Sequence, residues 1–200
     1  MGRLIVIVLV LCAGWFVYNE YGYRYYLSNV RNNIDQNMVM GPANAEMKIV
    51  AYVDYDSSAS RRLYPVLLNL LSSTSNVSVA IRPIATNNQL SNLMTRVALL
   101  AKKKNQFIDV NNAFLTSNIN VDENYIKAAL RMIGWNFNAI QNELNDPSIS
   151  SELEQLQREA KMLNIQSLPV FYIDHVRMQG SAYTVSEIRT IMADLKSGRR

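Results

Sequence analysis

A short run of small residues is the part of this chain best placed to do chemistry. The run consists of Ser57, Ser58, Ala59 and Ser60. It follows a strand-like segment and precedes an amphipathic one, so we expect a strand-to-helix turn. A serine hydroxyl there could act as a nucleophile, but it needs a nearby base and donors for an oxyanion. The chain has one histidine, His175, and no Gly-x-Ser-x-Gly motif at the turn, so we favour helix capping by Asp56 or Ser57 over serine hydrolysis.

Cysteine and histidine usage excludes several other kinds of site. The only cysteine, Cys12, lies in the N-terminal apolar segment, so the rest of the chain has no thiol nucleophile, disulfide or cysteine-ligated metal. A single histidine excludes a histidine-rich metal site, and no calcium-loop pattern is present. We therefore expect neither metal nor cofactor. The net charge of +4 comes without a basic stripe interleaved with aromatic residues, so we expect no nucleic-acid binding.

The N-terminal segment indicates a membrane location. An apolar run extends from Leu4 to Tyr18, and aromatic residues of the kind found at membrane interfaces continue it. The run is short for a span of about 20 residues, and a signal-peptidase site fits poorly around Cys12. We expect residues 1–23 to form an uncleaved signal anchor or transmembrane helix that contacts the membrane through residues 4–21. A cleaved signal peptide is the alternative.

The orientation follows from charge. Arg3 and the N-terminal amine favour a cytoplasmic N-terminus, although Arg24 and Arg31 weaken that prediction. We expect a single-pass protein with the bulk of its chain across the membrane from the cytoplasm.

Residues 24–40 are predicted to form a juxtamembrane helical stalk. Their apolar side chains recur every three or four residues and form one narrow stripe, made of Leu27, Val30, Ile34 and Met38. Such a stripe could pack on its own domain, or it could pair with other copies of the chain or with a partner. Gly41–Glu46 then ends the helix.

The remaining sequence predicts an α/β domain with a helical insertion. Apolar strands are expected at residues 47–53 and 76–85, with a helix between them that contains Pro65, where we expect a kink. Five amphipathic segments follow, then a strand that includes Pro169, its hairpin partner and a last helix. The three parts are residues 41–86, 87–163 and 164–200.

This order of elements resembles the thioredoxin fold with an inserted helical domain, as in the DsbA-like thiol–disulfide oxidoreductases. The segment IVAYVDYDSSASRRLYPVL resembles the family's first strand, Cys-x-x-Cys turn and helix, with Ser57 and Ser60 at the two cysteine positions. The segment AKMLNIQSLPVFYID resembles the part that carries the family's cis-proline, here Pro169. The resemblance covers the chain from Gly41 to Ser197.

The departures from the family pattern imply a redox-inactive member without catalytic residues. The family uses a thiolate to attack a disulfide and a second cysteine to resolve the product, and serine does neither. Ala51 stands where many relatives carry an acid that helps to move protons. Pro169 either preserves the fold or, with Leu168 and residues 57–60, forms a groove that binds a partner.

The sequence and the resemblance together predict a non-catalytic, single-pass protein of the bacterial inner membrane with the bulk of its chain in the periplasm. We expect it to act as a protein-interaction or structural subunit of an envelope or secretion assembly, with other envelope proteins as its partners. Self-association through residues 24–40 is a further expectation. The alternative function is a redox-independent periplasmic chaperone or holdase that uses the former substrate groove.

Overall fold

The computed structural model describes residues 6, 10, 12, 14–15, 21–22, 24–30, 32–117 and 121–199, in two units, Met1–Ile34 and Asp35–Arg200. In the first unit, residues 24–30 are helical. Most of the predicted signal anchor lies outside the described residues. No helix within the described part combines the length and the apolar character needed to cross a bilayer.

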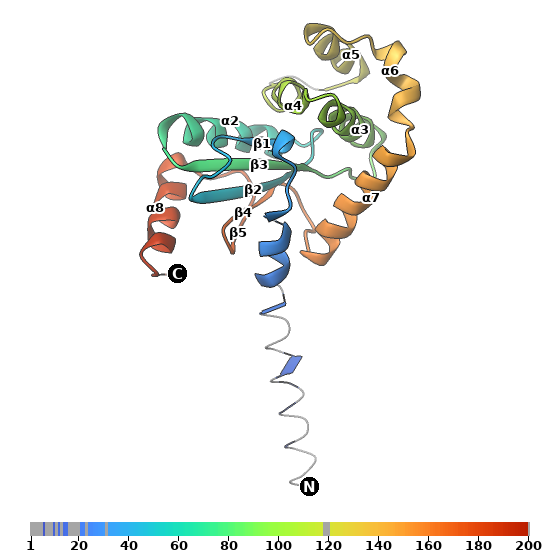
Figure 1. Ribbon diagram of the computed structural model, residues 1–200. Helices are drawn as coiled ribbons and strands as arrows, with labels where there is room; N and C mark the ends of the chain where they lie inside the picture. The colour runs from blue at the N-terminus through green and yellow to red at the C-terminus, as the bar shows by residue number, and fades with distance from the viewer. Residues whose placement is uncertain are drawn as a thin grey trace. The chain divides into compact units, whose positions relative to one another are not determined.

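A five-stranded mixed sheet forms the centre of the second unit (Figure 1). The strands are β1 (Val39–Met40), β2 (Met47–Val53), β3 (Val77–Pro83), β4 (Val170–Ile173) and β5 (Val176–Gln179). Their spatial order is β1-β3-β2-β4-β5, in which β2 and β3 are parallel and the other neighbours antiparallel. The connection between the two parallel strands is helix α2 (Ser58–Ser73), so the predicted β-α-β unit is confirmed.

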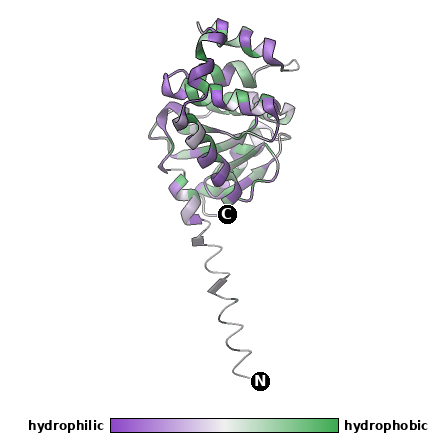
Figure 2. Cartoon of the chain, turned by 90° about the vertical axis from the view of Figure 1, so that its right-hand side faces the viewer, coloured by the Kyte–Doolittle hydropathy of each residue, from purple (hydrophilic) through white to green (hydrophobic). Residues whose placement is uncertain are grey.

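Apolar residues explain why β2 and β3 lie in the middle of the sheet. Every residue of β3 is buried, and so is every residue of β2 except Lys48, because both faces of these strands are covered. Figure 2 shows hydrophobic residues concentrated on the sheet, whereas the helices carry hydrophilic residues as well. Pro65 is exposed within α2, which is assigned as one helix from Ser58 to Ser73.

Five helices separate β3 from β4, as the amphipathic segments predicted. They are α3 (Gln89–Lys103), α4 (Phe107–Leu115), α5 (Glu123–Met132), α6 (Phe137–Leu144) and α7 (Pro147–Met162). Figure 1 shows α3 to α6 grouped together and α7 returning toward the sheet. Side chains cap four of these helices at their N-termini, and Asp122 caps α5 by accepting from the amide of Tyr125 at 2.7 Å.

The last part of the chain also follows the predicted order. The strands β4 and β5 form an antiparallel hairpin, and helix α8 (Val185–Lys196) ends the fold. A capping box fixes the start of α8, because the Thr184 hydroxyl accepts from the amide of Glu187 while the Glu187 carboxylate accepts from the amide of Thr184.

The predicted helix over residues 24–40 is wrong at its C-terminal end. The chain turns at Asn33 and forms a 3-10 helix, η1 (Gln36–Met38), before it enters β1. Asp35 starts this short helix by accepting from the amide of Asn37 at 2.9 Å. Val39 then pairs with Ala80 at the edge of the sheet. Residues 36–40 therefore belong to the unit that contains the sheet. The sequence analysis had started this domain only at residue 41.

Candidate functional site

The serine turn lies where β2 ends and α2 begins, as the sequence predicted. Ser57 is the N-cap of α2, with extended backbone angles, and its hydroxyl accepts from the amide of Ser60 at 3.4 Å. The amide of Ser57 donates to the carbonyl of Asp54 at 3.0 Å, which closes the turn onto the end of the strand. The Ser57 hydroxyl thus satisfies one of the free amides in the first turn of the helix.

The other three residues of the turn face different environments. The Ser60 side chain is fully buried, and its hydroxyl accepts from the amide of Asp54 at 3.1 Å. Ser58 is exposed and accepts from the Arg62 guanidinium at 3.3 Å, and Ala59 is half-buried. Ser57 and Ser60 are therefore both hydrogen-bonded to local backbone groups.

A buried carboxylate lies beneath the turn and was missed by the sequence analysis. Asp54 is only 7% exposed, and one of its oxygens accepts from the Ser91 hydroxyl at 2.7 Å and from the amide of Asp56 at 3.0 Å. The other oxygen accepts from the Thr86 hydroxyl at 3.3 Å. The carboxyl ends of two parallel strands meet at one edge of a sheet. The sequence could therefore have indicated this site through two polar residues, Asp54 just after β2 and Thr86 just after β3.

The register of β4 brings the second predicted segment to the same end of the sheet. Tyr52 near the end of β2 pairs with Val170, so Pro169 and Leu168 continue alongside the residues that lead into the serine turn. The peptide bond between Leu168 and Pro169 is cis. Pro169 is buried and Leu168 is half-buried. The topology therefore places Leu168, Pro169 and residues 57–60 at one edge of the domain.

His175 lies at the opposite end of β2 from the serine turn. It belongs to the connection between β4 and β5, where Asp174 donates its amide to the carbonyl of Lys48. The seven residues of β2 span roughly 20 Å between these two ends. The His175 ring instead lies 3.3 Å from the Asp174 carboxylate. His175 is therefore out of reach as a general base for Ser57.

A buried ion pair crosses from the sheet to the helical insertion. The guanidinium of Arg82 in β3 makes a bidentate contact with the carboxylate of Glu159 in α7, and its Nε donates at 3.0 Å. The Tyr52 hydroxyl donates to the same carboxylate at 2.6 Å. Burial and the Glu159 charge raise the pKa of Tyr52 well above its ordinary value, so Tyr52 remains a donor at neutral pH.

This ion pair was not predicted from the sequence, which singled out the neighbouring Ala51 instead. Successive strand residues point to opposite faces of a sheet, so Tyr52 and Ala51 face different layers. Glu159 lies on α7, 77 residues after Arg82, and nothing local marks it as the partner. The sequence could have indicated the buried pair only because Glu159 is an acidic residue on the apolar face of α7, beside Leu156 and Ala160.

The residues around the serine turn offer hydroxyl groups and the buried Asp54 carboxylate. Within the described ranges, no three His, Cys, Asp or Glu side chains lie close enough together to hold a metal ion. The hydroxyls of Ser57 and Ser60 are both used in the turn.

Comparisons with solved structures identify proteins that share this architecture. A thioredoxin-like oxidoreductase from Silicibacter pomeroyi DSS-3 is 19% identical with a TM-score of 0.73, over 82% of this chain and 94% of its own. A periplasmic thioredoxin-like protein from Salmonella enterica serovar Typhimurium is 18% identical with a TM-score of 0.72, over 84% and 95%. The thiol-disulfide exchange protein alpha-DsbA2 from Wolbachia pipientis is 14% identical with a TM-score of 0.68, over 88% and 97%.

The comparison with family models agrees with the fold. At these sequence identities, the solved structures show only that the fold is shared. A search of curated proteins finds no match. The thioredoxin family model matches residues 33–194, which include every strand and nearly all of α8. The chain belongs to the thioredoxin family.

Proposed function

We propose that this chain is a thioredoxin-family protein that binds other proteins and does not exchange disulfides. The proposal rests on the serine turn, where Ser57 and Ser60 stand at the two positions that correspond, by resemblance, to the reactive cysteines of the family. A serine hydroxyl is not ionised at neutral pH, and oxygen forms no exchangeable bond with sulfur, so neither step of the family reaction is available. The only cysteine, Cys12, lies far outside the turn in the sequence.

The proposal includes a location. We infer that residues 4–21 anchor the chain in the bacterial inner membrane and that the bulk of the chain faces the periplasm, as a subunit of an envelope or secretion assembly. The apolar run of the sequence supports the anchor, and similarity to a periplasmic thioredoxin-like protein supports the compartment. Protease added to intact spheroplasts should therefore digest the chain beyond the anchor. Protection of the whole chain would contradict this location.

A second candidate function is a redox-independent chaperone. The observation that favours it is Leu168, a half-buried apolar side chain beside the turn, where an extended unfolded segment could pack. The two functions differ in their range of partners. A structural subunit binds a few defined proteins, whereas a chaperone binds many unfolded chains.

Crosslinking in native membranes separates these functions. At native expression, the subunit function predicts that a few defined envelope proteins are crosslinked to the chain, and Leu168→Asp should reduce their yield several-fold because it places a charge in the contact. The control is Met162→Asp, a change at a 64% exposed apolar residue of α7, which should leave the yield unchanged. Broad crosslinking to unfolded chains would favour the chaperone. Recovery of the chain alone would contradict both.

A further inference from the structure

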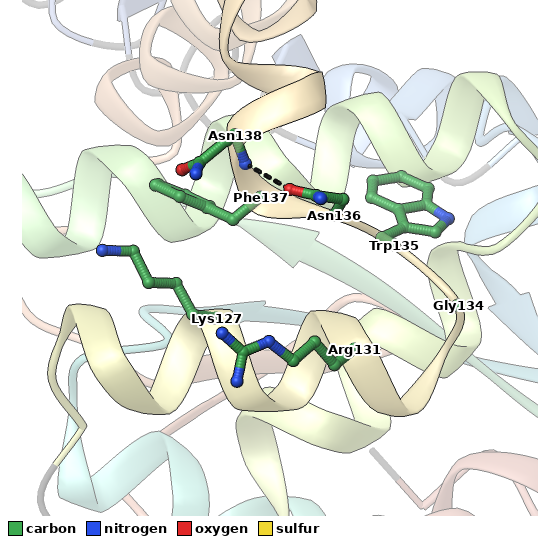
Figure 3. Close-up of a pocket in the computed structure, with 7 residues that line it drawn as sticks. All are labelled: Lys127, Arg131, Gly134, Trp135, Asn136, Phe137 and Asn138. Carbon is green, nitrogen blue, oxygen red and sulfur yellow. Dashed lines mark hydrogen bonds between the residues drawn. The ribbon is translucent and has the colours of Figure 1, made fainter.

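A charged pocket lies at the end of the helical insertion, in the connection between α5 and α6 (Figure 3). It has a volume of about 550 Å³ and is lined by Lys127 and Arg131 of α5 and by residues 134–138. Lys127 and Arg131 are four residues apart, so they project from the same face of α5. Neither cation belongs to the serine turn or to the edge around Leu168, and the lining contains no acidic residue.

The two cations differ in how they are engaged. The Lys127 ammonium is 2.6 Å from the Glu123 carboxylate and 5.4 Å from the centroid of the Phe137 ring. Arg131 is exposed, and within the described part of the chain its guanidinium has no ion pair and no hydrogen bond. In Figure 3 this guanidinium lies between α5 and the start of α6. A planar group with five donors is therefore available to a ligand in the pocket.

One wall of the pocket is held in place by hydrogen bonds. The Trp135 indole donates to the side-chain oxygen of Gln106 at 2.6 Å, and the Gln106 amide donates to the carbonyl of Ile133 at 3.5 Å. The Lys104 ammonium lies 5.8 Å from the centroid of the Trp135 ring. These contacts tie the α5–α6 connection to the end of α3, so the position of the wall does not depend on a ligand.

The positive character of the pocket comes from side chains. The amide of Asn138, in the first turn of α6, already donates to the side-chain oxygen of Asn136 at 3.0 Å. The dipole of α6 adds to the attraction for a negative group, but only as a small contribution near the surface. The Arg131 guanidinium is thus the main donor left for an anion, and in Figure 3 the Asn136 and Asn138 side chains lie on the α6 side of the pocket, across from it.

We propose that this pocket binds a carboxylate side chain from an acidic segment of a protein partner. A guanidinium matches a carboxylate with two parallel hydrogen bonds, and the aromatic rings of Trp135 and Phe137 accommodate the aliphatic part of a glutamate. Met132, which follows Arg131 at the end of α5, is 88% exposed and offers apolar contact to a longer segment. The proposal rests on the proposed protein-binding function, for which it names the chemistry of the partner.

The test measures binding of a short fluorescent peptide of alternating glutamate and glycine to the full chain in detergent, by anisotropy. The same peptide with glutamine in place of glutamate is the ligand control. Arg131→Gln should weaken binding of the glutamate peptide about tenfold, because it removes a charge-assisted contact. The matched variant is Arg158→Gln, at an exposed arginine of α7 in a surface pair with Glu154, which should change binding less than twofold.

Four results would overturn the inference. Equal weakening by Arg131→Gln and Arg158→Gln would mean that the peptide follows net charge alone. Equal binding of the glutamine peptide would mean that no carboxylate is recognised. Strong binding of free succinate without binding of the peptide would identify a small-molecule site. If the glutamate peptide fails to bind while Leu168→Asp still reduces crosslinking to defined partners several-fold, this inference fails and the proposed function stands.

Discussion

Replacing Glu159 with alanine is expected to lower the free energy of unfolding by about 3–5 kcal/mol. The Glu159 carboxylate is buried and accepts from both Arg82 and Tyr52. Its removal leaves the Arg82 guanidinium buried without a counterion and the Tyr52 hydroxyl without an acceptor. Urea denaturation of the purified chain, followed by circular dichroism, measures this change. The change in the free energy of unfolding follows from the shift in the midpoint urea concentration, provided that the dependence on urea (the m-value) is unchanged.

Two further variants separate the ion pair from general effects of mutation. Glu154→Ala removes an exposed carboxylate of the same helix, 3.3 Å from Arg158, and should cost less than about 1 kcal/mol. The double change Arg82→Met with Glu159→Leu replaces both charges by apolar groups and should be markedly more stable than Glu159→Ala. If Glu159→Ala costs no more than Glu154→Ala, the buried pair does not hold α7 to the sheet.

The double change Ser57→Cys with Ser60→Cys is expected to create a pair of cysteines that oxidises fully to a disulfide. In a Cys12→Ser background, thiol titration should find two thiols in the reduced protein and none after mild oxidation. The reason is geometric, since the Ser57 hydroxyl already lies 3.4 Å from the amide of Ser60 at the start of α2. The helix N-terminus should also favour the thiolate form of the first cysteine.

A matched pair tests whether the position matters. Ser58→Cys with Ser60→Cys, in the same background, places the two thiols two residues apart within α2, where one side chain is exposed and the other buried. Side chains at that spacing do not face each other, so this pair should remain reduced under the same oxidant. Resistance of the Ser57 and Ser60 pair to oxidation would show that the turn is not arranged as described here.

Local sequence patterns predicted most of the fold. The strand β2 has the predicted bounds, 47–53, because a mostly apolar run of seven residues between a Gly-Pro turn and the serine turn favours a buried strand. The five helices of the insertion were predicted from their apolar stripes, and β5 was predicted as the hairpin partner of the strand that follows Pro169. The turn at residues 57–60 was placed correctly because its neighbours on both sides carry strong periodic signals.

The features that sequence analysis missed depend on contacts between distant segments. The strand β1 has two residues and exists because Val39 and Met40 pair with β3, so it carries no periodic signal of its own. Met38 continues the apolar stripe of the preceding helix, yet it is fully buried in the sheet-bearing unit. The helical spacing of apolar residues therefore extends beyond the actual end of the helix. It includes Met38, although Asp35 already starts the separate 3-10 helix η1.

The polar sites illustrate the same limit. Serine, threonine and aspartate residues are common in turns, so the contact of Asp54 with Ser91 could be anticipated only from the meeting of two parallel strand ends. The pocket beside Arg131 depends on how α5 and α6 are placed against each other, which the 3.6-residue period of each helix does not specify.

The most direct test of the central claim is a thiol–disulfide exchange assay with the native full-length chain. Reduction of insulin by dithiothreitol, followed by turbidity, should proceed at the rate seen without protein. The Cys12→Ser variant should behave identically, and the protein with Ser57→Cys and Ser60→Cys serves as the positive comparison. Faster precipitation with the native chain that persists in Cys12→Ser would contradict the claim that serines at positions 57 and 60 leave a protein that binds without exchanging disulfides.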